Sequence, residues 1–314
     1  MGDLRKRLKE DIDRKLKYAS MVLAFAGVMA LGALTRMLSE SQARRFSAML
    51  GDFAHQKIGL RRDVVYRNLS LTFPEKSKEE IRSIATGVYR NVAINLLNVL
   101  RLPLIRNRED AAALVDFDTE PFWRGTDNGR KGAVLVSAHY GNWELMAMTF
   151  GLLVKPLTII VKELSNILVD RSMNELRTLR GNRVVYDDKA LREGLRLLGE
   201  GGVLAVLADQ SDPSATYFGE FLGRRATMFH GPAFFALKAR VPLFVGMCRP
   251  AEDGRYRGEI QEIDTSDLTF CKEDVATLAL RYTRVIEEYI RRSPEEWFWL
   301  HNRWKNGGDG QTVG

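Results

Sequence analysis

The sequence predicts an α/β fold in which a largely parallel central sheet is covered by helices on both faces and is preceded by an N-terminal helical membrane anchor. Two observations support this prediction. From residue 131 onward, short runs rich in Val, Ile and Leu alternate with helical patterns, and such alternation is typical of a parallel sheet. Near the N-terminus, the segment 18–35 carries no charged residue.

The composition is that of a globular protein long enough to bury a core. Of the 314 residues, 45% are apolar and 28% are charged, with a net charge of +7 and a pI of about 9.4. This basic balance favours anionic partners such as phosphates, acidic lipids, acidic carrier proteins or nucleic acid, although mild basicity without any functional reason is equally common. Cys248 and Cys271 have neither metal-ligand nor CxxC spacing, which favours a reducing compartment.

We expect residues 1–38 to form the membrane anchor. Residues 4–17 are typical of a basic amphipathic helix that lies on a membrane surface, although a helix packed on the protein is the alternative. Its apolar stripe is formed by Leu4, Leu8, Ile12 and Leu16. As a helix, the uncharged segment 18–35 would reach roughly 27 Å, slightly less than a hydrocarbon core of about 30 Å. No convincing cleavage site follows it, so we do not expect a removed signal peptide.

The rest of the chain is expected to form one domain over residues 39–306, followed by a disordered, glycine-rich tail over 307–314. Residues 39–100 are helical in pattern, with a helix start at Ser77 where Glu80 completes a capping box. The predicted strands are 133–138, 157–161, 183–186, 203–208 and 242–248. The predicted helices that cover them are 143–153, 164–180, 188–199, 231–239 and 273–292.

The main functional candidate is a histidine at the end of the first buried strand. His139 lies where α/β sheets bind ligands, at the carboxyl end of a strand. Gly141 permits an unusual turn, Asn142 is a good N-cap, and Glu144 then falls in the first turn of a helix. At such a junction, the Glu144 carboxylate can hold one imidazole nitrogen of His139 and leave the other as a base.

The alternative is a structural role, in which backbone groups satisfy His139 and Glu144 interacts with the helix dipole. A metal site is not supported, because HExxH is absent and His55, His230 and His301 are scattered. A serine hydrolase is not supported either, because GxSxG is absent. We therefore expect neither a metal nor another cofactor.

The stretch HYGNWE (139–144) has the His-x4-acid spacing of the glycerolipid acyltransferase superfamily and resembles its lipid A biosynthesis (lauroyl/myristoyl) branch. The resemblance covers almost the whole chain. Four further stretches resemble blocks of this family in the same order: RNLSLTFPE (67–75), LADQS (207–211), YFGEFLGRRATMFHGPA (217–233) and EEWFWLHNRWK (295–305). Asn302 departs from the family, which commonly has arginine there.

The resemblance implies an enzyme that moves a fatty acyl group from a thioester, on acyl carrier protein or coenzyme A, to a hydroxyl of a glycolipid such as a lipid A precursor. It implies that His139 is the general base, that Glu144 fixes its tautomer, and that backbone N–H groups of the 139–143 turn hold the oxyanion. The residues expected to bind substrate are Asn142, Arg171, Arg180, Asp209, Gln210, Thr227 and Arg303.

Structural roles for these residues remain open. An ordinary surface or structural role is the alternative for each arginine. Asp209 is expected to end a buried strand at the same sheet edge as His139, either as a second acid or as a strand-end cap. The tryptophans of the last block, Trp297, Trp299 and Trp304, are expected to pack, although indole rings also suit a membrane interface.

The supply of the donor constrains the topology. Because thioester donors are cytoplasmic, a span over 18–35 with its basic flank inside would place the catalytic residues on the wrong face. We therefore expect residues 1–38 to lie in one leaflet, at the anionic cytoplasmic face of the inner membrane. The alternatives are the same chemistry on another glycolipid, an aminolipid or a lysophospholipid, or a non-catalytic basic protein that binds membranes or nucleic acid. Nucleic acid is disfavoured because the aromatic residues do not interleave with Lys and Arg.

Overall fold

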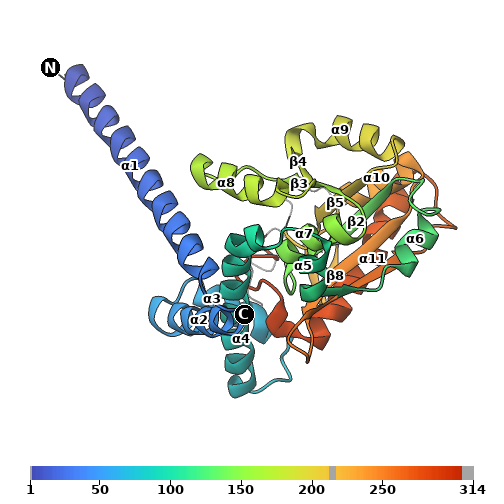
Figure 1. The fold of residues 1–314 in the computed structure, drawn as a ribbon, viewed down its shortest axis with the longest axis horizontal. Helices are drawn as coiled ribbons and strands as arrows, with labels where there is room; N and C mark the ends of the chain where they lie inside the picture. Colours follow the sequence, from blue (N-terminus) through green and yellow to red (C-terminus); the bar gives the residue numbers. More distant parts are fainter. Residues whose placement is uncertain (1, 212–216, 306–314) are drawn as a thin grey trace.

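The computed structural model describes residues 2–211 and 217–305, which form a long N-terminal helix and an α/β body (Figure 1). The body is built around a seven-stranded sheet in the order β1-β9-β8-β2-β5-β3-β4. Its strands are β1 (Val115–Phe117), β2 (Ala133–Ser137), β3 (Leu157–Val161), β4 (Arg183–Tyr186), β5 (Val203–Leu207), β8 (Leu243–Pro250) and β9 (Tyr256–Ile263). A separate antiparallel hairpin is formed by β6 (Phe218–Phe221) and β7 (Arg224–Thr227).

The sheet is largely parallel, which confirms the predicted fold class. Strands β8, β2, β5, β3 and β4 are parallel neighbours, and these are the five strands that the sequence predicted. Strand β9 pairs antiparallel with β8, and β1 runs parallel to β9. The sequence did not reveal β1, β9 or the β6–β7 hairpin.

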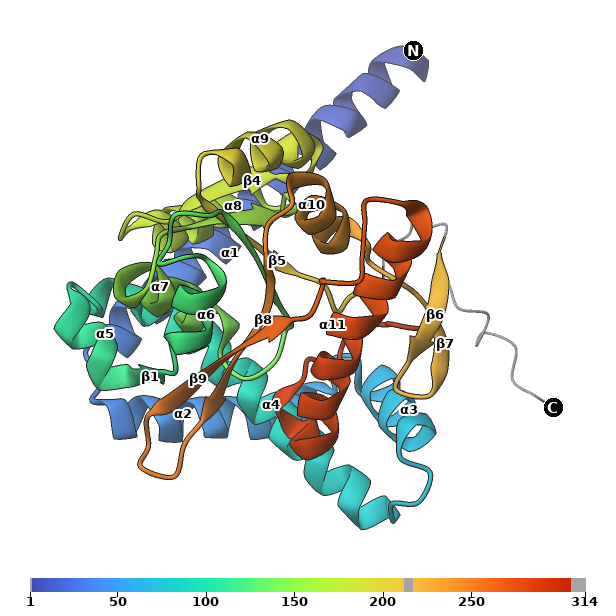
Figure 2. The same ribbon diagram turned by 90° about the vertical axis from the view of Figure 1, so that its right-hand side faces the viewer.

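Helices cover both faces of the sheet, and β2 shows how its residues divide between them. Ala133 and Leu135 pack into a core shared with α4, α5, α6 and α7, whereas Val134 and Val136 pack into a core shared with α10 and α11. Figure 2 shows α10 and α11 on one side of the sheet and α6 and α7 on the other. The helices of the body that follow α2 are α3 (Arg62–Thr72), α4 (Lys78–Arg101), α5 (Arg108–Leu114), α6 (Glu120–Gly125), α7 (Trp143–Leu153), α8 (Ile167–Thr178), α9 (Asp187–Gly199), α10 (Gly231–Ala239) and α11 (Lys272–Arg292).

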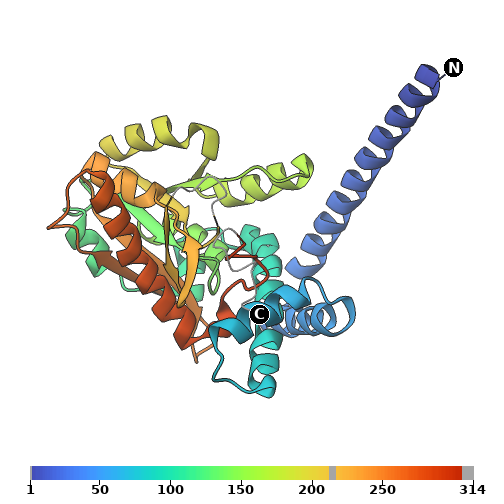
Figure 3. The same ribbon diagram turned by 180° about the vertical axis from the view of Figure 1, so that it is seen from behind.

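The expected basic helix and the apolar segment after it form one continuous helix, α1 (Gly2–Arg36), which projects from the body (Figures 1 and 3). Its part over Asp13–Arg36 is long and apolar enough to cross a membrane, by length and composition. The structure does not describe the side chains of Leu4, Leu8 and Ile12, where the apolar stripe was expected, and the tail expected over 307–314 lies outside the described residues.

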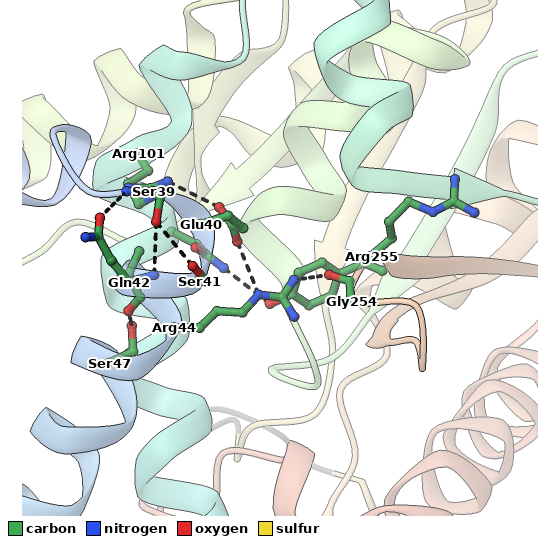
Figure 4. A network of polar contacts seen from close by, with 12 residues as sticks. Ser39, Glu40, Ser41, Gln42, Arg44, Ser47, Arg101, Gly254 and Arg255 are labelled. Carbon is green, nitrogen blue, oxygen red and sulfur yellow. Dashed lines mark hydrogen bonds and ion pairs between the residues drawn. The ribbon is translucent and has the colours of Figure 1, made fainter.

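The C-terminal end of α1 is fixed to the body. Thr35 is buried, and Arg101 of α4 donates hydrogen bonds to the carbonyl oxygens of Thr35 and Leu38. The same guanidinium forms an ion pair with Glu40, 3.2 Å away, at the start of α2 (Glu40–Phe53) (Figure 4). Ser39 caps α2 with a complete capping box, and the box predicted at Ser77 is likewise present.

Gly141 connects the sheet to α7 and leaves no room for a side chain. Its φ is +55°, and a Cβ atom there would lie 1.8 Å from the carbonyl oxygen of Cys248. Gly181 also has a positive φ, +97°, but a Cβ atom there would meet nothing within 4 Å.

We expect Gly141→Ala to lower the free energy of unfolding by more than about 3 kcal/mol, because backbone must move to relieve the clash. The matched control, Gly181→Ala, should lower it by only about 1–2 kcal/mol, the strain of a positive φ. Denaturant titration measures both values, and equal losses would contradict the close approach of Gly141 to β8.

Candidate active site

Two adjacent strands bring together the residues at the centre of the site. In the β2–β5 register, Ser137 is opposite Leu207. Two residues further along each strand are His139 and Asp209, so the register alone places these two side chains side by side at the carboxyl edge of the sheet. The backbone N–H of Ala208 still donates to the carbonyl oxygen of Ser137, 3.0 Å away, which extends the pairing past the strand ends.

Asp209 contacts both the side chain and the backbone of His139. Its Oδ1 lies 2.9 Å from Nδ1 of His139, and its Oδ2 accepts the backbone N–H of His139 at 3.0 Å. The same Oδ2 accepts the indole N–H of Trp297 at 2.7 Å. Burial alone would raise the pKa of Asp209, but the nearby imidazole and these donors outweigh it and hold the pKa below its usual range. Asp209 is therefore a buried, ionised carboxylate.

Glu144 contacts a different residue. Arg177 of α8 donates from Nε to Glu144 Oε2 at 3.0 Å and from Nη2 to Glu144 Oε1 at 2.5 Å. Burial alone would lower the pKa of Arg177, but these hydrogen bonds raise it. Among the described residues, no hydrogen bond joins Glu144 to His139. The expectation that Glu144 holds the imidazole is therefore corrected by the structure, in which Asp209 holds it.

The backbone of the 139–142 turn is held by neighbouring segments. Gly141 N–H donates to the carbonyl oxygen of Glu296, and Asn142 N–H donates to that of Cys248, both at 2.9 Å. The Asn142 side chain accepts the N–H of Leu145, as expected for the N-cap of α7. Since His139 N–H is bound to Asp209, three N–H groups that were expected to form an oxyanion hole donate within the protein instead.

A cavity of about 540 Å³ opens beside His139, within the range of roughly 300–1,000 Å³ that is usual for small-molecule sites. His139, Glu144, Arg177, Gln210 and Lys162 supply most of its polar lining. The amide nitrogen of Gln210 lies 3.3 Å from Nδ1 and 3.4 Å from Nε2 of His139. The apolar lining comes mainly from the sheet, from α7 and from three aromatic residues, and it includes Leu135, Met146, Ala147, Leu157, Ile159, Ala205, Trp143, Phe229 and Phe298.

The other residues expected to bind substrate lie outside the cavity lining. Arg171 is exposed on α8, and Arg180 donates to the carbonyl oxygen of Ile105 at 2.9 Å. Asn142 is the buried N-cap, and Thr227 is buried on β7. Arg303 is 1% exposed, its guanidinium carbon lies 4.8 Å from the centre of the Phe221 ring, and burial lowers its pKa to about 10, which leaves it charged at neutral pH.

Sequence reasoning missed Arg177 and the link through Trp297. Arg177 is one of many arginines in the chain, and only the fold places it against Glu144. The three tryptophans of the last block pack together as predicted, with ring centroids 4.7–6.4 Å apart. Trp297 differs from Trp299 and Trp304 because its N–H reaches a carboxylate, whereas theirs reach backbone carbonyl oxygens.

A histidine held by a buried carboxylate in the lining of a largely apolar cavity has the geometry of a general base for an apolar substrate. The chain belongs to the bacterial lipid A biosynthesis acyltransferase family, whose model matches residues 10–306. This confirms the resemblance seen in the sequence blocks, and the protein is an acyltransferase.

Three relatives show the breadth of this similarity. The lipid A biosynthesis lauroyltransferase of Escherichia coli (strain K12) is 27% identical over 269 residues, which cover 85% of this chain and 86% of the relative. The lipid A biosynthesis palmitoleoyltransferase of the same strain is 24% identical, with 84% and 85% covered. The phosphatidylinositol mannoside acyltransferase of Mycolicibacterium smegmatis is 27% identical, with 65% and 66% covered.

We expect Trp297→Phe to lower kcat by roughly tenfold, because Asp209 loses one donor of a charge-assisted hydrogen bond and its pKa rises. Trp299→Phe is the matched control, because its indole N–H donates to the Pro294 carbonyl oxygen at 2.6 Å. That control should lose comparable stability and keep kcat. Steady-state kinetics combined with thermal melting tests this, and equal kcat for the two variants would contradict a special role of Trp297.

Proposed function

We propose that the protein transfers a fatty acyl group from an acyl thioester, carried by acyl carrier protein or coenzyme A, to a hydroxyl of a glycolipid such as a lipid A precursor. The observation that supports this most directly is that His139, held by Asp209, lines the largely apolar cavity. The names of the two Escherichia coli relatives support lipid A as the acceptor. The mycobacterial relative supports a different glycolipid as the second candidate.

In this mechanism His139 is the general base. Asp209 accepts the hydrogen bond from Nδ1, so the proton resides on Nδ1 and Nε2 carries the lone pair. Nε2 takes the proton of the acceptor hydroxyl as its oxygen attacks the thioester carbonyl. When the carbon–sulfur bond breaks, the imidazolium returns that proton to the departing thiolate. Asp209 stabilises the imidazolium between these two steps, and a positioned base contributes roughly 10²–10⁴-fold.

Glu144 has a different role in this proposal from the one expected on sequence. Its carboxylate fixes the Arg177 guanidinium in the cavity wall, beside His139. A planar guanidinium suits phosphate and carbonyl oxygens. We therefore assign Arg177 to binding an anionic or carbonyl group of a substrate, and Glu144 to positioning Arg177.

The remaining cavity suits the acyl chain. Its apolar side chains come from β2, β3, β5 and α7, which are rigid elements of the core. An acyl chain bound there buries apolar surface at roughly 25 cal/mol per Å². A thioester is already activated, so the reaction requires neither a metal nor a covalent enzyme intermediate.

We expect His139→Ala to reduce turnover by roughly 10²–10⁴-fold without loss of the fold, because the side chain lies at a strand end.

Asp209→Asn should reduce kcat by roughly 10- to 100-fold, the value of one charge-assisted hydrogen bond. Glu144→Gln should act mainly on KM. A radiolabelled acyl-transfer assay measures all three, with melting curves as the control for folding. If Glu144→Gln abolished kcat and Asp209→Asn left it unchanged, the assignment of the two carboxylates would be reversed.

We also propose that α1 anchors the enzyme in one leaflet of the inner membrane, on its cytoplasmic face. Its exposed apolar side chains include Leu16, Tyr18, Leu23 and Met29. The amide of Asn166, next to α8, donates to the carbonyl oxygen of Met21 at 3.1 Å, so the start of α8 lies beside the first part of the apolar segment. A perpendicular span over Asp13–Arg36 would draw the exposed charges of α8 into the bilayer, which is costly.

Substituting both Tyr18 and Leu23 with Glu should release the protein from vesicles even in low salt, because each large apolar side chain contributes roughly 1.5–3 kcal/mol on burial. These side chains are 63% and 72% exposed, so the fold should be unaffected. Deleting residues 1–38 should also release the protein, but it removes the carbonyl acceptors of the buried Arg101. Vesicle sedimentation measures this release.

A second experiment tests the topology. Protease added outside spheroplasts should leave residues 39–314 intact. Digestion from outside would contradict the one-leaflet anchor.

A further inference from the structure

The helix that follows the anchor has one face on the protein and one in solvent. Ala43, Ser47 and Gly51 of α2 are buried against α4. The contact is close, because a Cβ atom on Gly51 would lie 2.5 Å from the Cα atom of Arg90. Helical spacing then turns the row Arg45, Met49 and Phe53, four residues apart, away from the body.

This exposed face continues through the π-helical turn η1 (Ala54–Ile58) to Leu60 and is rich in large apolar side chains. Met49 is 68% exposed, Phe53 56%, Ile58 63% and Leu60 55%. Single exposed apolar residues are normal, but several within one short segment mark an interaction site. We call the residues Arg45, Met49, Phe53, Lys57, Ile58 and Leu60 the α2 surface.

The charges around the α2 surface are mainly basic. Residues 41–62 contain six basic or acidic side chains, of which five are Lys or Arg. The single acid, Asp52, is held in a bidentate pair by Arg90, at 2.6 and 2.8 Å. Arg44 is likewise held by Glu40, 3.3 Å away, so four of the five bases remain beside the exposed apolar side chains. This is the composition of a segment that lies on an anionic bilayer.

The α2 surface is also held next to the anchor. Arg101 binds the end of α1 and the first residue of α2 at once, so the two helices keep a fixed relation (Figure 4). Both lie on the same side of the molecule, as Figures 1 and 3 show. Once α1 is in the bilayer, the local concentration of lipid near α2 is high, so a weak contact suffices.

We propose that the α2 surface is a second membrane contact, which docks on anionic phospholipid and fixes the rotation of the enzyme about α1. One helix alone leaves that rotation free. Two contacts determine how the mouth of the catalytic cavity faces the bilayer. This inference rests on the membrane anchor proposed above, and the experiment below separates failure of the anchor from failure of the second contact.

The test uses the full chain with Cys271→Ser, which removes the exposed native cysteine. The other cysteine, Cys248, is buried and is therefore protected from labelling. A single cysteine is placed at Met49, at Leu23 of α1, or at Leu191 of α9, and is labelled with a fluorophore. Leu191 is the matched control, since it is 56% exposed among mixed charges. Vesicles of phosphatidylethanolamine and phosphatidylglycerol carry brominated lipid as the quencher.

We expect quenching at positions 23 and 49 and none at 191. Quenching at 23 without quenching at 49 overturns the second contact and leaves the anchor intact. No quenching at 23 overturns the anchor. With phosphatidylcholine in place of both lipids, quenching at 49 should weaken more than quenching at 23, and an unchanged ratio would contradict the role of charge.

The functional test is the double variant Met49→Glu with Phe53→Glu, with Leu191→Glu as its control. Its activity on an acceptor embedded in anionic vesicles should fall about tenfold or more. Its activity on the same acceptor dispersed in detergent should equal that of the unmodified chain. The control variant should keep full activity both in vesicles and in detergent. Equal loss in vesicles and in detergent would overturn the proposal and assign the α2 surface to the fold or to a protein partner.

Discussion

The hydrogen bond between Nδ1 of His139 and the carboxylate of Asp209 joins two residues 70 positions apart, and the site depends on it. It exists because β2 and β5 are parallel neighbours in register and end at the same level. Charge in the interior is stable only when it is paired and hydrogen-bonded. Asp209 meets this condition through His139 and Trp297, so the sheet, the His139–Asp209 pair and the C-terminal segment stabilise one another.

The carboxyl edge of the sheet separates the polar and the apolar parts of the proposed reaction. Phe298 N–H donates to the carbonyl oxygen of His139, and Gly141 N–H donates to that of Glu296, so the C-terminal segment pairs with the turn like a short strand. This pairing holds the imidazole in the lining of a cavity that also contacts α7. In the proposed reaction, this places the base beside the apolar walls that would hold the acyl chain.

The sequence predicted the five parallel strands because each is a run of aliphatic residues bounded by turn signals. It predicted the helices from the helical patterns that lie between these runs. These aliphatic runs do not include β9, whose residues YRGEIQEI alternate polar and apolar as in a half-buried strand, or β1, which has only three residues. Five-residue spacing pointed to Glu144 as the partner of His139. The choice between Glu144 and Asp209 depends on strand register and on Arg177, which are properties of the tertiary fold.

The most direct test of this account is the protonation of the His139 ring, observed by nitrogen-15 NMR on the full chain with labelled histidine. We expect Nδ1 to carry the ring proton in the unmodified protein and in Glu144→Gln, and we expect Asp209→Asn to abolish this preference. A proton on Nε2 in the unmodified protein, or an Nδ1 proton that depends on Glu144 and not on Asp209, would contradict it.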